Sequence, residues 1–313
     1  MTSLGAADLS PDRFPLKLAP QRHYVQVVAA VVVLLLAFLL ARSLALNDNM
    51  QWGMVWKYLG NTQVRQGIVT TIGLTVLCMV MGTILATILA VMRLSNNRVL
   101  STVSFAYTWV FRGTPLLVQL IFWYNLAALF PVLSIGIPFT DIHAGVSTNT
   151  VITPFIAAVL GFTLNEAAYM SEIVRAGIQS VNIGQREAAL STGMTEGQSM
   201  THIVLPQALR VIVPPTANQA INLLKATSLV AFIAGDDLLS AVQNIYAVNF
   251  AVIPLLVVAS IWYLIIVSVA SVGQYYLEHR VGRGVTNFNP AAMTDQITLA
   301  KAAPGQPSRG SPA

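Results

Sequence analysis

The chain has 313 residues, of which 55% are apolar and only 9% are charged, and its formal net charge at neutral pH is +5. So small a charged share excludes an ordinary soluble globular domain, in which about a quarter of the residues carry charge. The charged residues separate long uncharged intervals, a pattern typical of a membrane protein with several spans. The modest positive charge therefore does not indicate a nucleic-acid partner.

Intervals long enough to cross a bilayer recur along the chain. No Asp, Glu, Lys or Arg occurs in residues 24–41, 66–92, 113–140 and 238–277. Two further apolar segments, 151–175 and 211–235, contain isolated charges. Since about 20 apolar residues cross the hydrocarbon core, the sequence predicts an all-α membrane protein with six transmembrane helices.

The segments outside the main apolar pattern are expected to be tails, an extra helix and one loop. The first helix, at residues 24–46, exceeds the roughly 7 to 15 apolar residues of a signal peptide, so we interpret it as retained. Residues 1–23 and 287–313 lack apolar periodicity and are predicted to be tails, the second of them disordered. The loop at residues 131–149 is long enough to form a small external structure that could meet an outside partner.

Basic residues are unevenly divided between the two sides of the predicted bundle. With a cytoplasmic N-terminus, the inner segments hold Arg13, Lys17, Arg22, Arg93, Arg98, Arg112, Arg175, Arg186, Arg210, Arg280, Arg283, Lys301 and Arg309. The outer side holds Arg42, Lys57 and Arg65. This positive-inside asymmetry predicts that both termini, and the loop around Glu187, lie in the cytoplasm.

A polar segment at about residues 182–204 lies between two apolar runs. Asn182 can cap a first short helix, Gly193 permits a turn, and Thr195 with Gln198 forms a capping-box pattern for a second helix. We therefore expect two short helices bent at a glycine, an object that can dock into a partner. The alternative is an ordinary helical hairpin between two spans.

The spacing within this segment is more specific than its composition. Glu187, Ala188 and Ala189 are followed by Gly193, and Ile203-Val204-Leu205-Pro206 comes nine residues later. This arrangement resembles the coupling loop of importer-type ABC transporter permeases, which inserts into a groove on the ATP-binding subunit. The resemblance implies that Glu187, Ala188, Ala189 and Gly193 make the contact with the ATPase.

Further blocks resemble the polar amino acid permeases of bacterial ABC importers, a histidine/glutamine permease-like family. The matching blocks are residues 111–119, 168–181, 205–210 and 225–229, together with Asn218. They fall within residues 60–280 in the family's order, and imply a five-helix type I importer permease domain after the extra first helix. They also imply a bacterial inner-membrane location, ABC ATP-binding subunits carrying ATP and Mg, a second permease subunit, the same or related, and an extracytoplasmic solute-binding protein.

Polar residues inside apolar spans are the candidate substrate path, because charges in a bilayer are costly and usually face a cavity or a partner. Arg112, Gly113 and Thr114 precede Pro115 at the expected start of the third span, where a guanidinium and free amides could bind a carboxylate. The alternative is that Arg112 marks the cytoplasmic boundary and pairs with lipid phosphate.

The fourth and fifth spans supply the remaining candidates. In the fifth, Pro214 and Pro215 predict a discontinuous helix. The alternative is that they only kink the helix, while Asn218 and Asn222 hold it to a neighbouring span. The path residues expected there are Asn218, Gln219, Lys225 and Ser228. In the fourth span, Glu172 and Arg175 are expected to pair with each other, whereas Glu166 could meet either the solute or Lys225. Asp236 and Asp237 are expected at the outer end of the fifth helix as a solvated cap or a contact for a solute-delivering protein.

Several chemistries find no support in the sequence. It contains no G-x-x-x-x-G-K-[ST] phosphate loop, no catalytic triad pattern and no histidine spacing typical of a metal site, so we expect no enzyme activity, metal or cofactor in this chain. The predicted function is the permease of an ATP-driven amino acid importer, with a stand-alone secondary transporter or channel as the alternative. Because Lys225 would disfavour a cation nearby, a neutral or acidic amino acid is favoured, unless Glu166 reverses the local sign.

Overall fold

The computed structural model describes residues 24–136 and 143–282. It divides into two compact units, residues 1–52 and 53–313. The predicted tails, 1–23 and 287–313, lie outside the described residues.

The first unit is built on one long apolar helix. Helix α1, Tyr24–Ala45, consists almost entirely of Val, Leu and Ala, and every one of its residues is exposed. A 3-10 turn, η2 at Asp48–Met50, follows it and is capped by the Asn47 side chain. The predicted extra helix is thus present, and its surface, apolar from Val27 to Ala41, suits contact with lipid.

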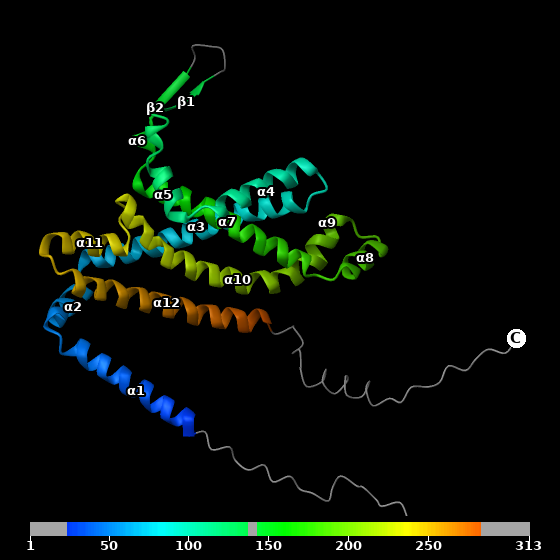
Figure 1. Ribbon diagram of the computed structural model, residues 1–313. Coiled ribbons are helices and arrows are strands. Elements are labelled where there is room, and N and C mark those ends of the chain that lie inside the picture. Colours follow the sequence, from blue (N-terminus) through cyan, green and yellow to red (C-terminus); the bar gives the residue numbers. More distant parts are fainter. Residues whose placement is uncertain (1–23, 137–142, 283–313) are drawn as a thin grey trace, which may run out of the picture. The chain divides into compact units, whose positions relative to one another are not determined.

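Two helices form the centre of the second unit. Helix α3, Thr62–Leu94, is capped by Asn61 and packs along α7, Pro154–Gln179, more extensively than any other pair of elements (Figure 1). Small residues allow the close approach: a Cβ at Gly82 would lie 3.1 Å from the Glu166 side chain on α7. Helix α7 begins with Thr153 as its cap and a proline in its first turn, a favourable start.

The predicted third span is divided into two helices. Helix α4, Arg98–Gly113, ends where Pro115 removes a backbone donor, and α5, Leu116–Tyr124, begins directly after it. Arg112 therefore lies at the end of a helix of 16 residues, and the expectation that it starts the span is wrong. A helix does begin here, at Leu116, but another helix ends just before it, so the position is a break between two helices.

Helices also run through and beyond the polar segment that follows α7. They are α8 (Ile183–Ser191), α9 (Glu196–Ser199), the π-helical turn η4 (Met200–Val204), α10 (Leu205–Ala226) and the 3-10 turn η5 (Thr227–Ile233). Helix α10 is continuous through Pro214 and Pro215, so the predicted discontinuity there is wrong. The helical pattern changes instead after Ala226, at the start of η5.

The C-terminal part of the unit packs against the N-terminal end of α3. Helices α2 (Trp52–Leu59), α11 (Leu238–Asn249) and α12 (Val252–Gly282) share an apolar cluster centred on Val55, Val242 and Leu255. Asp237 is fully buried and caps α11 through the amides of Leu239 and Ser240. It is a cap, as expected, but not a solvated one.

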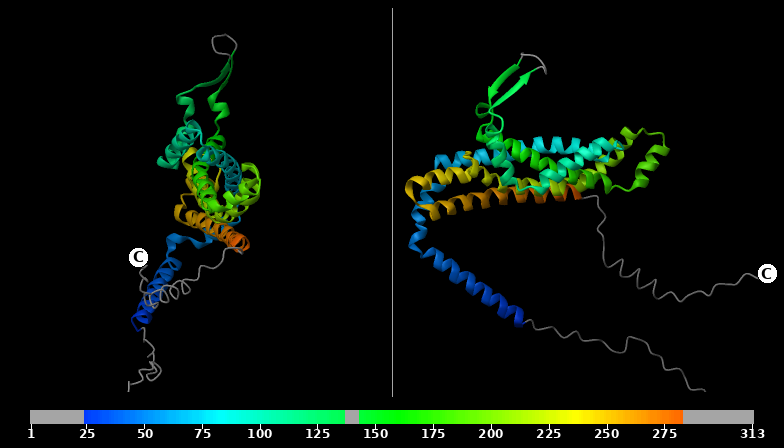
Figure 2. Two further views of the ribbon diagram at one scale, coloured as in Figure 1. Left: turned by 90° about the vertical axis from the view of Figure 1, so that its right-hand side faces the viewer. Right: turned by 45° about the horizontal axis from the view of Figure 1, so that its top comes forward.

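Between α5 and α7 the chain leaves the helices. The 3-10 turn η3 (Leu126–Ala128) is followed by an antiparallel hairpin of β1 (Val132–Gly136) and β2 (His143–Ser147), then by α6 (Thr148–Val151). Val132 pairs with Ser147 and Gly136 with His143. The hairpin projects away from the long helices in each view (Figure 2). The loop thus forms a small structure, as predicted, and adds the strands to an otherwise helical fold in the described residues; its position outside the membrane stays a prediction.

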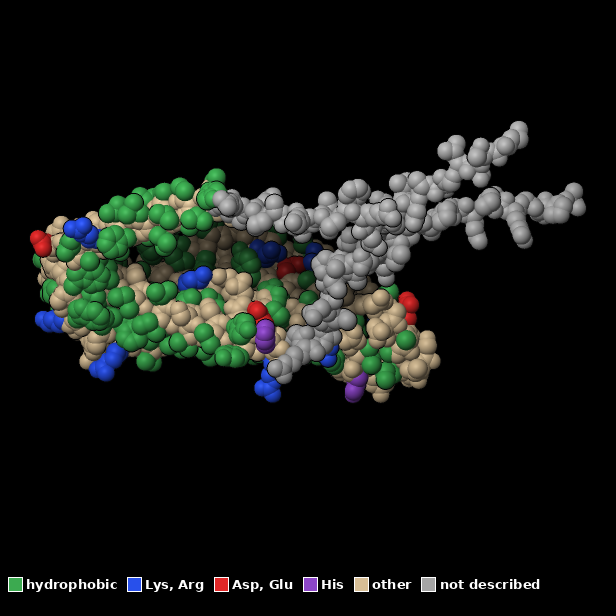
Figure 3. All heavy atoms as spheres, turned by 90° about the horizontal axis from the view of Figure 1, so that it is seen from below, with side chains coloured by type: hydrophobic (Ala, Val, Ile, Leu, Met, Phe, Trp, Pro, Cys, Tyr) green, Lys and Arg blue, Asp and Glu red, His purple; other side chains and the backbone are tan. Residues whose placement is uncertain are grey.

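Three described helices, α1, α3 and α12, are long and apolar enough to cross a membrane. The other expected spans are not apolar or long enough, because α7 and α10 contain many polar residues besides their charges and the third span is divided at Pro115. The predicted count of six spans is therefore not confirmed by composition. On the face shown in Figure 3, apolar side chains cover much of the described surface and charged side chains are few and scattered, as expected of a membrane protein.

The crossing of α3 with α11 generates a stability prediction. A Cβ at Gly67 would lie 2.8 Å from the Leu238 Cα and 2.9 Å from the Asp237 carbonyl oxygen. Since a backbone cannot yield as a side chain can, Gly67→Ala should destabilise the protein by about 1–3 kcal/mol. Gly73→Ala on the same helix should leave the stability unchanged or raise it, because no neighbouring element lies within 4 Å of the Cβ position there. Thermal unfolding in detergent compares the two, and equal midpoints would contradict the prediction.

Candidate functional site

A cavity of about 390 Å³ opens where the α4–α5 break faces α7 and α10. The break supplies Arg112, Gly113 and Thr114, and α10 supplies Gln219 and Asn222. Helix α7 contributes Asn165, Glu166 and Tyr169. Most of these side chains are polar, in a helix bundle that is otherwise apolar, so this is the strongest candidate for a solute site.

Glu166 is the buried carboxyl group of the cavity. It is only 3% exposed, and its Oε2 accepts a hydrogen bond of 3.2 Å from the Gln219 Nε2. Its Oε1 has no partner among the described residues. A buried, half-satisfied carboxyl group is costly to maintain, which is typical of a group that binds a ligand. The described residues show no ion pair between Glu166 and Lys225, and Lys225 does not line this cavity.

Arg112 carries the positive charge of the cavity. Its guanidinium lies over the Tyr169 ring at 5.3 Å, and no carboxylate of the described chain lies within ion-pair distance of it. The side chain is exposed. Arg112 is therefore available to an anionic group.

Two amide side chains hold the helix break open. The Gln119 Nε2 donates to the carbonyl oxygens of Phe111 and Thr114 and to the Thr114 hydroxyl, at 2.9, 3.1 and 2.8 Å. The Asn165 Nδ2 also donates to the Phe111 carbonyl, at 2.9 Å. Sequence reasoning missed both residues; the signal was a glutamine in an apolar run and an asparagine beside Glu166.

The backbone donors at the break differ from those expected. The Thr114 amide donates to the Val110 carbonyl at 3.1 Å and is not free. Pro115 caps α5 without a side-chain hydrogen bond, so the amides of the first turn of α5 are the ones without helical partners. Leu116, in that turn, lines the cavity. The start of α5 thus replaces Gly113 and Thr114 as the source of amide donors.

The structure brings together five of the eight predicted path residues: Arg112, Gly113, Thr114, Glu166 and Gln219. Asn218, Lys225 and Ser228 do not line the cavity. Asn218 and Lys225 are exposed, and the Ser228 hydroxyl donates to the Lys225 carbonyl at 2.8 Å. The predicted pair of Glu172 and Arg175 is confirmed at 2.6 Å.

The polar segment after α7 has the predicted two-helix form. Asn182 caps α8 through the Gly184 amide at 2.8 Å, and Thr195 and Gln198 form a capping box at α9. Gly193 joins them with a φ of 88°, a conformation that residues with a Cβ rarely adopt. The expected local structure is therefore confirmed.

An ion pair joins the two helices of this segment. The Arg186 guanidinium binds the Glu196 carboxylate through two contacts of 2.8 and 3.0 Å. This hydrogen bonding lowers the pKa of Glu196 and raises that of Arg186, so the pair is fully charged at neutral pH. Among the predicted coupling residues, Glu187, Ala188 and Gly193 are exposed, whereas Ala189 is buried and packs inside the segment.

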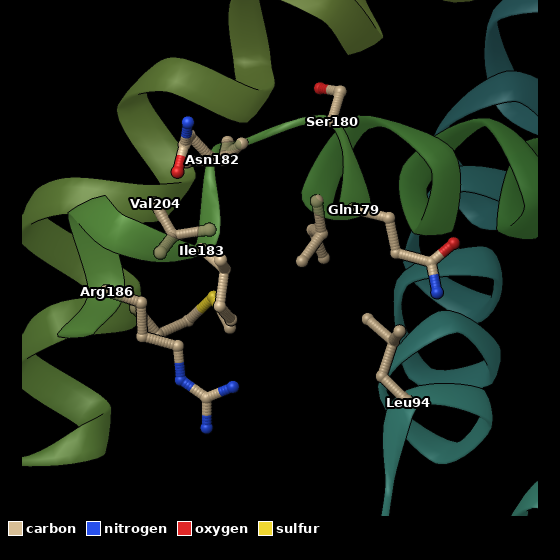
Figure 4. Close-up of a pocket in the computed structure, with 10 residues that line it drawn as sticks. Leu94, Gln179, Ser180, Asn182, Ile183, Arg186 and Val204 are labelled. Atoms are coloured by element: carbon tan, nitrogen blue, oxygen red, sulfur yellow. The ribbon is translucent and has the colours of Figure 1, made fainter. Parts of the chain in front are cut away.

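A cavity of about 610 Å³ lies where this segment meets the ends of α3 and α7 (Figure 4). Leu94, Gln179, Asn182 and Arg186 are among the residues around it. The space separates the two-helix segment from the bundle on this side, so the segment is joined to the bundle mainly through α7 and the η4–α10 continuation.

Comparison with known proteins gives the family. Residues 80–283 match the family model described as "Binding-protein-dependent transport system inner membrane component". The chain is 42% identical over 284 residues, 90% of this chain and 87% of the relative, to the arginine transport system permease protein ArgU of Corynebacterium glutamicum. It is 38% identical over 215 residues, 68% of this chain and 91% of the relative, to the glutamate/aspartate import permease protein GltK of Escherichia coli O157:H7.

Solved structures agree with this assignment. A crystal structure of an amino acid ABC transporter with histidines matches with a TM-score of 0.59 and 32% identity, over 70% of this chain and 94% of that one. The MetNI methionine ABC transporter, in an inward-facing form, matches with a TM-score of 0.56 at 17% identity, over 70% of this chain and 96% of that one, which shows the shared fold.

These relatives favour the importer permease over a stand-alone transporter or channel. In such a system the permease is not an enzyme, and ATP hydrolysis lies on a partner. The chain belongs to the family of binding-protein-dependent transport system inner membrane components and is the multi-pass permease component of an ABC amino acid importer.

Proposed function

We propose that the cavity at the α4–α5 break binds the transported amino acid through two opposite charges. Arg112 and the free amides of the first turn of α5 take the α-carboxylate, since a guanidinium and a helix N-terminus both favour an anion. Glu166 takes a cationic group through its unpartnered Oε1. The observation that carries the proposal is a buried carboxyl group with one unpartnered oxygen. Its residue lines the same cavity as an arginine that has no carboxylate partner among the described residues.

The same arrangement favours a cationic amino acid. The expectation of a neutral or acidic solute depended on Lys225 lying beside it, and Lys225 does not line the cavity. Glu166 does line it, and supplies a negative charge where burial strengthens electrostatic attraction. The name of the arginine permease at 42% identity supports the same class of solute.

The remaining path candidates require a second permease subunit. Asn218 and Lys225 are exposed side chains of α10, a helix that also carries Gln219 into the cavity. We propose that a second copy or a related chain completes the path along this side of α10. Ser228 is the weakest of the path candidates, because its hydroxyl donates a hydrogen bond to the Lys225 carbonyl three residues earlier.

The proposed assembly places the α8–α9 segment against an ATP-binding subunit that carries ATP and Mg. Glu187, Ala188 and Gly193 are exposed for this contact. The positive-inside distribution supports a cytoplasmic position for this segment and for both termini in a bacterial inner membrane. The β1–β2 hairpin then lies outside, where a solute-binding protein would deliver the amino acid.

Removing the charge of Glu166 should change selectivity. In Glu166→Gln we expect arginine uptake to fall by roughly 10- to 100-fold in kcat/KM, because a charge-assisted hydrogen bond contributes about 1.5–3 kcal/mol. Glutamine uptake should fall less. Transport by the reconstituted importer measures this, and Glu278→Gln, whose carboxyl pairs with Gln274 in α12, is the control. An unchanged arginine-to-glutamine ratio in Glu166→Gln would refute the role.

Arg112 and Lys225 should differ in their effect on uptake. Arg112→Gln should raise the KM for every amino acid by roughly tenfold or more, since each has the α-carboxylate that Arg112 binds. Lys225→Gln, which also removes one positive charge, should leave the preference for cationic over acidic solutes unchanged. The competition of labelled arginine with glutamate measures both. If Lys225→Gln reverses the preference, Lys225 rather than Glu166 sets the selectivity.

The bend at Gly193 should be needed for coupling. A β-branched residue at a φ of 88° costs on the order of 1–2 kcal/mol, so Gly193→Val should separate ATP hydrolysis from uptake while membrane insertion persists. Gly197→Val is the matched control, because Gly197 lies in α9 with open space around its Cβ position. ATPase and uptake rates are compared in proteoliposomes; normal uptake by Gly193→Val would disprove the coupling role of the bend.

A further inference from the structure

A second polar cavity, of about 450 Å³, lies beside the proposed solute site. Helices α3, α4 and α7 form it, and its charged residues are Arg93, Arg112, Glu172 and Arg175. Three arginines and one glutamate give it a formal charge of +2. This cavity therefore attracts anions.

The positive charge is only partly compensated. Arg175 is bound to Glu172 at 2.6 Å, whereas Arg93 has no carboxylate of the described chain within ion-pair distance. The Arg93 guanidinium donates to the Ser101 carbonyl at 3.1 Å and lies over the Phe105 ring at 4.6 Å. These contacts fix its position and leave its charge without a counter-ion.

Arg93 lies at the end of the bundle that carries the α8–α9 segment. It is in the last turn of α3, and the next residue, Leu94, borders the cavity beneath that segment. Helix α3 has 33 residues and is about 50 Å long, well beyond the roughly 30 Å of the hydrocarbon core. An arginine in its last turn is therefore at the depth of lipid head groups. The Arg93 guanidinium lies over the Phe105 ring, and Arg112 is seven residues, or about 10 Å, farther along α4 than Phe105.

The wall of this cavity on α4 is apolar and uncovered. Trp109 is 70% exposed and Phe105 50% exposed, and both line the cavity. Val103 and Val110 on the same helix are also exposed. A free cation next to exposed aromatic and aliphatic side chains fits a ligand with an anionic head and an apolar body, rather than a zwitterionic solute.

We propose that the Arg93 end of this cavity binds the phosphate of an anionic phospholipid, with the acyl chains lying along the exposed face of α4. Basic pockets between transmembrane helices at the head-group level are suited to such lipids. Arg93 supplies the unpaired charge, and Trp109 supplies the interfacial aromatic ring. This cavity shares Arg112, Gly113 and Tyr169 with the solute site, but neither Glu166 nor Gln219 lines it, and Arg93 does not line the solute site.

The test measures lipid binding by the purified importer in neutral detergent. Native mass spectrometry counts retained phosphatidylglycerol and phosphatidylcholine with identical acyl chains. We expect wild type to prefer phosphatidylglycerol by roughly tenfold, and Arg93→Gln to lose that preference, as one charge-assisted contact of about 1.4 kcal/mol would require. Arg98→Gln removes the same charge from the first residue of α4, outside the cavity, and should keep the preference.

Competition identifies the source of the anion. Inorganic phosphate and free arginine or glutamate, each in millimolar excess, should not displace phosphatidylglycerol, because they lack acyl chains to contact α4. Displacement by phosphate would mean a simple anion site, and displacement by an amino acid would mean part of the solute path; either outcome overturns the proposal. Disulfide cross-linking of a Trp109→Cys variant to a second permease copy would also overturn the proposal, because a protein and not a lipid would then cover this face of α4. If the wild-type protein retains phosphatidylglycerol and phosphatidylcholine equally, the proposal is refuted by that measurement alone.

Discussion

The candidate solute site depends on the break between α4 and α5 and on the amides that hold it open. Pro115 cannot donate a backbone hydrogen bond, so the carbonyl groups before it need other partners. Gln119 supplies three donor contacts to Phe111 and Thr114, and Asn165 from α7 adds a fourth. In a bilayer, unsatisfied backbone groups would cost several kcal/mol each, so these side chains make the break tolerable. The break in turn brings Arg112 and the start of α5 to the same cavity.

Glu166 shows how the packing of long helices fixes a charged group in the membrane. Gly82 on α3 leaves room for the glutamate side chain, since a Cβ there would contact it at 3.1 Å. Gln219 from α10 then satisfies one carboxyl oxygen, and the other has no partner among the described residues. Three helices far apart in the sequence thus set the position of one carboxyl group. A carboxyl group held this way does not have to be ordered before it binds a ligand, which suits the role proposed for Glu166.

The α8–α9 segment is, by contrast, a local structure. Its caps, its glycine turn and the Arg186–Glu196 pair all lie within residues 182–198. It joins α7 on one side and, through the π-helical turn η4, α10 on the other. Because α7 carries Glu166 and α10 carries Gln219, movement of this segment would act directly on the hydrogen bond between them. The geometry offers a physical link between the proposed ATPase contact and the proposed solute cavity.

The sequence by itself determined the features that depend on neighbours along the chain. The extra apolar helix, the caps of the α8–α9 segment, the turn at Gly193 and the Glu172–Arg175 pair all follow from short-range patterns. Only the tertiary structure decided which polar residues share a cavity. Gln119 and Asn165 meet through contacts between distant helices, whereas Lys225 points elsewhere although it is close to Gln219 in sequence. Periodicity indicates that a residue lies in a span, but its direction depends on how that helix is rotated against its neighbours, which the packing of the whole bundle fixes.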